Sequence, residues 1–516
     1  MKLRVGISEI SPGWKLILQQ IGISFSKVDI NKTIPQNKYA VLIVSTQNAV
    51  RNKKHLLHYL HNGGSLLVEA DIAEKYLDEK IKQIYIKYLY SDSTLLTSVP
   101  CDFHRKSSVS SHAQHVEDQR GRKSIAVKKA DKGTALILPS GLVSSLCDYN
   151  IKRKMFPSDF AERNPSERVS EVSKEGIFYL IDHCLQYLFH IRDLPYIHLW
   201  FFPDGAKSQF SFRVDTDFSS KHEVENLYQV CRKNNIPATW FVEVKSQKDW
   251  IKVYSEMVNQ EIGYHCYSHR IYSTPEENRQ DFKQGLHVIQ QSGINPKGYA
   301  APYGEWNPDV IRIAQEFGFH YSSEFGLAYD AIPFFPCHGN SFSTVLQIPI
   351  HPISAGSLRR ARHTKEDIFN YYLKIMEMKR TTYQPIIFYH HPLHGIFDVF
   401  DKIFQRVRKI NIPVLPLGDY SDWWRKRNNV AWNAEYINGK IYLHSSNTDP
   451  SFWISATLPN NKQILKPATE TGQFLENGNI LEKKEILYHY DIKKLRKKNL
   501  RMLVHDIEHY LGKIKQ

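Results

Sequence analysis

Cysteine is scarce in this chain, and the few that occur follow no spacing. Six cysteines are scattered over 516 residues, and no two of them are separated by only two residues. They are Cys101, Cys147, Cys184, Cys231, Cys266 and Cys337. This pattern argues against a disulfide framework and against a structural zinc knuckle.

Long apolar runs are missing as well. None approaches the ~20 residues of a membrane-spanning helix, and the first residues, Met1–Ile7, turn polar too early for a secretion signal. We therefore expect a cytoplasmic protein. The net charge of +15, from 68 basic and 53 acidic residues, would suit an anionic polymer or the face of an anionic membrane. No nucleic-acid-binding motif accompanies that charge, so we expect no nucleic acid partner.

The first part of the chain, residues 1–195, alternates short apolar strands with helices. This rhythm predicts an α/β domain with an open, doubly wound sheet. Strands are expected at residues 3–8, 24–29, 39–45, 65–70 and 133–141, and helices at residues 13–21, 51–61 and 176–189. The polar stretch 91–122 gives no clear prediction.

This part resembles the flavodoxin-like fold of class I glutamine amidotransferases, through its strand–helix rhythm and through Gly63-Gly64 before the fourth strand. Catalysis in that family requires a cysteine on a sharp turn after a strand. No cysteine precedes Cys101, and no phosphate-binding loop is present. We therefore expect a non-catalytic scaffold or recognition domain.

The middle part, residues 196–425, repeats β/α units over about 200 residues, as a closed or nearly closed barrel would, with its chemistry at the C-terminal ends of the strands. Strands are expected near residues 210–214, 238–242, 299–302, 347–350 and 385–389, and helices near residues 222–234, 249–259, 275–292 and 308–318.

The last part, residues 426–516, reads as a small β module with turns at Asn438-Gly439 and Asn477-Gly478, closed by a basic helix. The apolar stripe of that helix is Ile492, Leu495, Leu503, Val504, Ile507, Leu511 and Ile514. Two interpretations stay open for the helix. It docks through its apolar stripe with a solvated basic face, or it makes a peripheral contact with an anionic membrane or a lipid-linked substrate.

Two histidines four residues apart, His265 and His269, are the most informative feature of the sequence. On one helical turn their β-carbons would lie about 5–6 Å apart, close enough to share a metal ion. Asp215 and Asp217 follow a buried strand and offer a carboxylate. Two histidines and one aspartate leave coordination positions open for water and substrate. Taken singly, the histidines would suit a structural role, and the aspartates a helix cap and an ion pair with Arg213.

Four segments, in this order, resemble the polysaccharide deacetylases of carbohydrate esterase family 4, which carry the NodB homology domain. The resemblance covers roughly residues 205–425. The segments are Arg213–Asp217, Gly263–His269, Tyr299–Gly304 and Pro385–Pro392. Three departures stand out: Thr216 separates the two acids, Cys266 replaces a Ser or Thr, and Ala300 stands where the family has an arginine that holds the catalytic base.

The resemblance implies a role for each matched residue. Asp217, His265 and His269 would hold a divalent metal, with Zn²⁺ expected first and Co²⁺ or Mn²⁺ as alternatives. Asp215 would be the general base, and the backbone N–H of Tyr303 would donate to the oxyanion. His391 or His390 would be the general acid. His391 is favoured, because a His followed by Pro ends this strand in many relatives. Arg213 is the candidate to replace the missing arginine.

Substrate contacts are expected from Arg213, Trp306, Pro302 and Glu324, with core packing as the alternative for the aromatic residues near them. These features predict a metal-dependent hydrolase that removes N-acetyl groups from a glycan or a glycan-lipid precursor. The alternatives are a deformylase or other amide hydrolase acting on a sugar nucleotide or lipid-linked sugar, and a pseudoenzyme that binds glycan without turnover.

Overall fold

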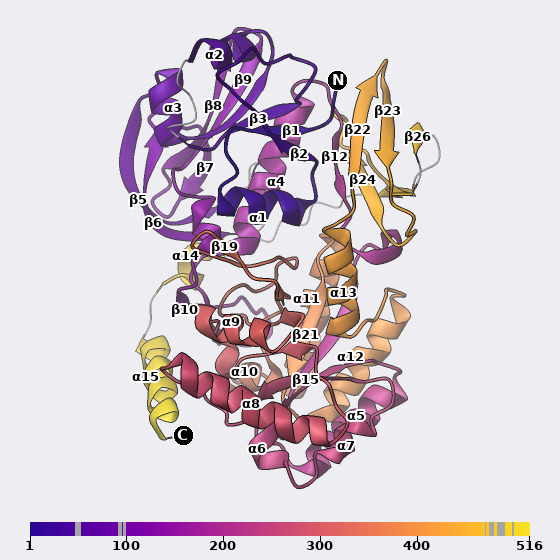
Figure 1. Ribbon diagram of the computed structural model, residues 1–516. Helices are drawn as coiled ribbons and strands as arrows, with labels where there is room; N and C mark the ends of the chain where they lie inside the picture. The colour runs from indigo at the N-terminus through magenta and orange to yellow at the C-terminus, as the bar shows by residue number, and fades with distance from the viewer. Residues whose placement is uncertain are drawn as a thin grey trace.

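The structure is a computed structural model of the 516-residue chain. It describes residues 1–46, 53–90, 95, 100–469, 471–473, 479–481, 491–497 and 500–515. Figure 1 shows an N-terminal α/β part in the upper half, a second α/β part in the lower half, and the C-terminal strands beside the upper part.

The N-terminal part is built on a nine-stranded sheet in the order β2-β1-β3-β4-β9-β8-β7-β5-β6. Its first five strands are parallel, as the alternating pattern predicts. They are β1 (Val5–Ile7), β2 (Phe25–Lys27), β3 (Val41–Val44), β4 (Ser65–Glu69) and β9 (Gly133–Leu138). The accompanying helices are α1 (Pro12–Ile21), α2 (Lys53–His61), α3 (Ala70–Leu77) and α4 (Lys174–His190). The amidotransferase-like assignment of this part stays a prediction.

Four antiparallel strands extend the same sheet. They are β5 (Ile81–Tyr90), β6 (Cys101–Ser110), β7 (His115–Asp118) and β8 (Lys123–Ala130). A hairpin of β10 (Ile151–Met155) and β11 (Ser166–Ser170) then leaves this part and reaches the second one. There the Ser170 N–H donates to the Phe325 carbonyl at 3.1 Å, and the Lys154 ammonium donates to the Tyr329 hydroxyl at 3.2 Å.

The second part has a parallel seven-stranded sheet in the order β20-β17-β16-β15-β14-β13-β21. Because β20 and β21 stand at opposite edges, the sheet is a curled half-barrel, so the closed form of the expected closed or nearly closed barrel is excluded. Its strands are β13 (Phe210–Asp215), β14 (Thr239–Glu243), β15 (Glu261–Cys266), β16 (Gly298–Tyr299), β17 (Tyr321–Ser322), β20 (Leu346–Gln347) and β21 (Ile386–His390). A small ribbon of β18 (Cys337–His338) and β19 (Ser341–Phe342) precedes β20.

Helices cover the outside of the half-barrel, and most begin at a side chain that caps them. Ser220 and Glu223 form a capping box at the start of α5, and Thr274 caps α8 ahead of a proline. The helices are α5 (Lys221–Lys233), α6 (Val244–Gln247), α7 (Lys252–Ser255), α8 (Pro275–Gln291), α9 (Pro308–Glu316), α10 (Ala355–Arg360), α11 (Lys365–Thr381), α12 (Phe397–Lys409) and α13 (Leu417–Arg427). The helix expected over residues 249–259 is reduced to the short helix α7, and a second short helix, α6, precedes that range.

The C-terminal strands are joined to both other parts. They are β22 (Trp432–Ile437), β23 (Lys440–Ser445), β24 (Trp453–Thr457), β25 (Gln463–Pro467), β26 (Gly472–Gln473) and β27 (Asn479–Leu481). β24 pairs with β12 (Tyr196–Leu199), which the sequence placed at the boundary of the barrel. Asn438 and Gly439 make the expected turn with positive φ angles of 50° and 79°. The turn expected at Asn477-Gly478 lies outside the described residues.

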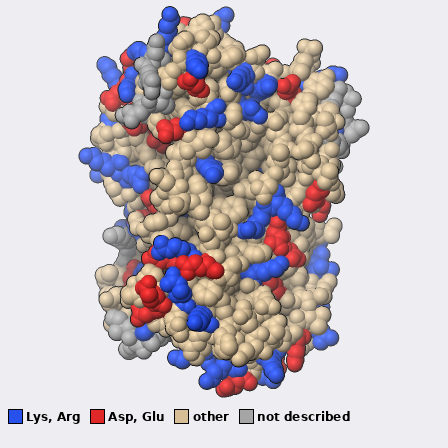
Figure 2. Space-filling view, in the orientation of Figure 1, with Lys and Arg blue, Asp and Glu red and all other residues tan. Residues whose placement is uncertain are grey.

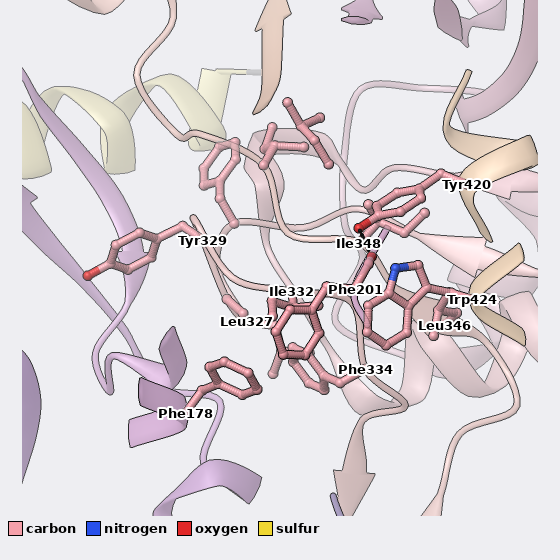
Figure 3. Close-up of a cluster of buried hydrophobic side chains, with 14 of the residues drawn as sticks. Phe178, Phe201, Leu327, Tyr329, Ile332, Phe334, Leu346, Ile348, Tyr420 and Trp424 are labelled. Carbon is pink, nitrogen blue, oxygen red and sulfur yellow. Dashed lines mark hydrogen bonds between the residues drawn. The ribbon is translucent and has the colours of Figure 1, made fainter. Parts of the chain in front are cut away.

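One apolar core runs through the interface between the two α/β parts. Figure 3 shows Phe178 of α4 facing a group of side chains that includes Leu327, Ile332 and Phe334 of the second part. A disulfide between Cys147 and Cys337 joins the same two parts, although the cysteine pattern gave no sign of it. Such an interface ties the predicted domains 1–195 and 196–425 into one body.

The end of the chain forms two helices, α14 (Ile492–Leu495) and α15 (Leu500–Lys515). Ile492 and Leu495 are buried, as a docked helix requires. On α15, however, the apolar stripe faces outward: Leu503, Val504, Ile507 and Leu511 are all exposed. The expectation of docking through this stripe is therefore wrong for α15, which lies at the margin of the half-barrel in Figure 1. The side chain of Ile514 lies outside the described residues.

Two surface properties complete the description. Within the described ranges, no helix combines the length and the apolar character needed to cross a membrane. On the face shown in Figure 2, basic and acidic side chains are interspersed over the lower half, so this face does not carry the net charge as a single patch.

Candidate metal centre

Three polar side chains converge at the C-terminal edge of the half-barrel sheet. Asp217 follows β13 by two residues, His265 lies in β15, and His269 lies in the loop after β15. Their four-residue spacing suggested that the two histidines share one helical turn. The structure shows that they do not. His265 belongs to the strand, and the chain bends back after Cys266 so that His269 faces the same point.

The distances between these side chains suit a shared cation. His265 Nε2 lies 3.0 Å from Asp217 Oδ1, and His269 Nε2 lies 3.1 Å from Asp217 Oδ2. All three ligand atoms lie within 4.8 Å of one another. Ligands bound at about 2.0–2.1 Å to a tetrahedral ion lie about 3.4 Å apart, so only small adjustments would bring these atoms onto one ion.

The hydrogen bond of His265 fixes its tautomer. Its Nδ1 lies 2.5 Å from the carbonyl oxygen of Ala300, which can only accept, so Nδ1 carries the proton. The lone pair of Nε2 then points toward Asp217. A carbonyl or carboxylate that orients a histidine in this way is the usual support of a metal ligand.

Several atoms of this group are buried without a hydrogen-bond partner in the described part of the chain. They are Asp217 Oδ1, His265 Nε2 and both ring nitrogens of His269. The close approach of Nε2 to Oδ1 lacks hydrogen-bond geometry, which is expected when both atoms direct lone pairs at one point. Burial would raise the pKa of Asp217, but His265, His269 and His391 outweigh burial and hold it well below its usual range. An ionised carboxylate and orphaned lone pairs fit a divalent cation.

Asp215 is held by Arg213 on the same face of β13. Residues two apart on a strand point to the same side, and the guanidinium donates from Nε to Oδ1 at 2.6 Å and from Nη2 to Oδ2 at 2.7 Å. Arg213 is fully buried, lies between the rings of Phe241 and Tyr389, and also donates to the carbonyl of Ser323. A carboxylate has about four lone-pair positions, so this fork leaves others free to face the cavity.

The two consecutive histidines at the end of β21 point in opposite directions. The Nε2 of His391 lies 3.4 Å from Asp217 Oδ2, and the residue lines the cavity. His390 is fully buried, lies 3.0 Å from the Gly395 carbonyl and stacks on Phe400 with ring centres 4.3 Å apart. Of the two candidates for the general acid, only His391 faces the metal ligands.

The remaining predicted residues divide between the cavity and the core. Tyr303 lines the cavity, has a positive φ of 60°, and places its ring 4.7 Å from that of His269. Pro302, Trp306 and Glu324 are buried and are not among the residues that line the cavity. Trp306 packs against Tyr149, and Glu324 accepts the Ala301 N–H at 3.1 Å. The structure thus does not bring these three residues to the substrate side.

The cavity has a volume of about 450 Å³, and its wall includes residues that the sequence did not single out. Arg153, Glu167 and Arg168 come from the β10–β11 hairpin, and His505, Glu508 and His509 come from α15. Arg153 joins the two elements, because its Nε donates to Asp506 Oδ1 at 2.7 Å.

Phe218 is a further addition at the rim. It is 54% exposed, and its ring lies 5.4 Å from that of His269. The sequence offered one sign of its position, since it directly follows Asp217. The hairpin and α15 offered none, because neither carries a recognisable motif.

Residues 211–322 match the family model described as polysaccharide deacetylase. The match contains β13 to β17, and therefore Asp215, Asp217, His265, His269 and Tyr303. No curated protein matches the sequence.

Several solved structures resemble the second part of the chain. A Mycobacterium smegmatis protein assigned as a polysaccharide deacetylase has 18% identity and a TM-score of 0.38, over 44% of this chain and 92% of that one. A Pseudomonas aeruginosa PAO1 protein with the same assignment has 15% identity and a TM-score of 0.37, over 43% and 91% of the two chains. A carbohydrate esterase family 4 pseudoenzyme from Bacillus anthracis has 15% identity and a TM-score of 0.32, over 42% and 66%.

Proposed function

We propose that this protein is a metal-dependent hydrolase that removes N-acetyl groups from a glycan. One observation carries the proposal. The carboxylate of Asp217 and the imidazoles of His265 and His269 meet in one cavity, and a second carboxylate, Asp215, faces the same cavity while held by a buried guanidinium. The family match to residues 211–322 supports the glycan as substrate.

Asp217, His265 and His269 would hold the ion, and Zn²⁺ suits two nitrogens and one carboxylate. When bound, a divalent ion lowers the pKa of a coordinated water toward ~7 and polarises the amide carbonyl. Asp215 takes the proton of the attacking water, since Arg213 fixes its orientation and leaves lone pairs toward the cavity. The backbone N–H of Tyr303 is our candidate donor to the oxyanion that forms on the amide carbon.

His391 completes the reaction. As the C–N bond breaks, the departing sugar amine needs a proton, and His391 in its protonated form supplies it from the end of β21, the strand beside the one that carries Asp215. Asp215 then releases to solvent the proton it gained from water, and His391 takes up a proton from solvent, so both residues return to their starting states. Phe218 at the rim offers a ring against which a sugar face can pack.

A glycan-binding pseudoenzyme, the competing hypothesis raised by Ala300, is less well supported. The function of the missing family arginine needs a cation on the base, and Arg213 supplies it from the same strand, β13. The metal ligands and the base are thus all present. A deformylase would use the same residues, so only the released acid separates it from a deacetylase.

The test is an assay of the purified chain for bound metal and released acid. N-acetylglucosamine oligosaccharides serve as substrate, acetate and formate are measured separately, and metal content is measured by mass spectrometry. We expect one ion per chain and acetate release. Asp215→Asn, which is nearly isosteric, should keep the ion and lose the release, and His265→Ala should lose both. Glycan binding without metal and without acid release would refute the proposal, and formate in place of acetate would establish the deformylase.

A further inference from the structure

Helix α15 has an inverted arrangement of polar and apolar faces. Its polar side chains face the protein: Asp506 accepts from Arg153, and His509 Nε2 lies 3.6 Å from Glu305 Oε1 and packs on the ring of Tyr303. A helix on the surface of a globular protein normally turns its apolar stripe inward.

The outward face of α15 is a continuous apolar stripe. Leu503, Ile507 and Leu511 follow the i, i+4, i+8 pattern of one helix face, and Val504 lies beside them, three residues before Ile507; the exposed fractions of Leu503, Val504, Ile507 and Leu511 are 57%, 44%, 51% and 50%. Leu500 and Tyr510 flank them with exposed fractions of 77% and 66%. Single exposed apolar residues need no explanation, but a contiguous stripe of this kind marks a contact surface. We call these six residues the α15 stripe.

Basic residues surround the first turn of α15. Arg501 donates to the carbonyl of Arg360 at 3.3 Å. Burial, and then the positive charges of Arg163 and Arg362, lower the pKa of Arg501. Arg359, Arg360 and Arg362 are exposed at and just beyond the end of α10. The α15 stripe therefore begins beside a cluster of arginines.

This combination selects one occupant. A second copy of the chain whose α15 ran parallel to this one would bring the arginine clusters toward each other. An anionic lipid surface would instead cover the stripe with acyl chains and meet the arginines with headgroup charge, and each basic residue near such a surface adds to binding. We infer that α15 lies in the interface of an anionic membrane and holds the cavity mouth at the lipid surface.

The location of α15 connects this contact to the substrate. His505 and His509 on its inner side, together with the exposed Glu508, form part of the cavity wall. A lipid surface against the outer side would lie next to the mouth of the cavity. It follows, if the proposed deacetylase activity holds, that the substrate is a glycan anchored to lipid.

The test is co-sedimentation of the full chain with vesicles. The vesicles contain phosphatidylcholine alone, or phosphatidylcholine and phosphatidylglycerol at about 3:1. We expect binding to the anionic vesicles and loss of binding in high salt. The double variant Leu503→Ser/Ile507→Ser should bind at least about tenfold more weakly, since it removes two apolar side chains from the interface. Arg360→Gln/Arg362→Gln should weaken binding to the anionic vesicles and leave any binding to pure phosphatidylcholine vesicles unchanged.

Val258→Ser is the matched control, because Val258 is 66% exposed and lies outside α15. It should bind as the unaltered chain does. The replaced residues are all exposed, so thermal melting should be unchanged throughout. Failure of the unaltered chain to bind anionic vesicles would overturn the inference, and so would equal binding by the stripe variant. A dimer without vesicles that the stripe variant converts to monomer would assign the stripe to a second copy instead.

Activity separates this inference from the proposed function. The stripe variant should release acetate from soluble N-acetylglucosamine oligosaccharides at the normal rate. It should be slower on an N-acetylglucosaminyl lipid embedded in anionic vesicles. Vesicle binding without any acetate release would refute the proposed function and leave the membrane contact standing. Acetate release without vesicle binding would refute the membrane contact and leave the proposed function standing.

Discussion

Replacing Arg213 tests how the general base is held. The guanidinium makes two hydrogen bonds to Asp215, at 2.6 Å and 2.7 Å, and both side chains are almost completely buried. Arg213→Ala removes both bonds and leaves the carboxylate buried without its cation. Arg213→Lys keeps the charge but cannot reproduce the two-pronged contact.

The structure sets the expected magnitudes. Breaking a buried ion pair by removing one partner costs about 3–5 kcal/mol, so Arg213→Ala should melt at a clearly lower temperature. A well-placed general base contributes about 10²–10⁴-fold to a rate, and a base that has lost its orientation forfeits much of this factor. We expect kcat for acetate release to fall at least about 10²-fold in Arg213→Ala and less in Arg213→Lys.

The measurement needs a control for general destabilisation. Arg427 is equally buried, but it donates to the carbonyls of Trp200 and Ile21, far along the chain from the cavity residues. Arg427→Ala should lower the melting temperature and leave kcat of the folded fraction unchanged. Metal content should stay at one ion per chain in all these variants.

A second substitution sharpens the test. Ala300 occupies the position of the family arginine, and its carbonyl already orients His265. Ala300→Arg in the Arg213→Ala background places a guanidinium back at the position that directly follows β16 and should recover part of the lost kcat. If Arg213→Ala kept the kcat of the unaltered chain, Asp215 would not be the base that this guanidinium orients.

Three further predictions follow from the same contacts. His391→Ala should lower kcat by about 10²-fold or more through loss of the general acid, whereas His390→Ala should mainly lower the melting temperature, and the reverse outcome would reassign the acid. Burial lowers the pKa of His104 from 6.5 to about 3. Below about pH 6.5 the unfolded chain therefore takes up a proton that the folded chain does not, and stability falls by roughly 1.4 kcal/mol per pH unit toward pH 3. His104→Phe should flatten this slope in melts at acidic pH, and an unchanged slope would contradict the assignment. Reduction of the Cys147–Cys337 disulfide, which closes a sequence separation of 190 residues, should lower the melting temperature. Chain entropy gives an upper limit of about 5 kcal/mol, and melts with and without dithiothreitol, against Cys147→Ser, measure the effect.

The sequence predicted best those elements that are buried on both faces. Strands such as β3 (Val41–Val44) and β13 (Phe210–Asp215) are almost continuous apolar runs, and a parallel sheet covered by helices requires such runs. The antiparallel strands β5 and β6 were not predicted because polar residues interrupt both: Lys and Gln in β5, and Asp, His, Arg, Lys and Ser in β6. The place of these strands in the sheet depends on neighbouring strands that are distant in the sequence.

The site shows the same division. The four short motifs predicted which side chains would face one cavity, and the structure brings Asp217, His265 and His269 together. The sequence could not predict that Trp306 and Glu324 turn into the core, since the local pattern is the same whether these side chains face the core or the cavity. The direction of α15 also depends on information that periodicity lacks. An apolar stripe has the same period whether it meets protein or another apolar phase.

The position of α15 also has a consequence for biosynthesis. Translation runs from the N-terminus to the C-terminus, and domains tend to fold as they emerge. The β10–β11 hairpin is made before the strands that carry the ligands, and α15 after all of them. A nascent chain that has not yet released residue 500 can pair Asp217 with its histidines, but it has an incomplete cavity wall. The emergence of α15 from the ribosome would therefore set the moment at which the cavity wall is complete.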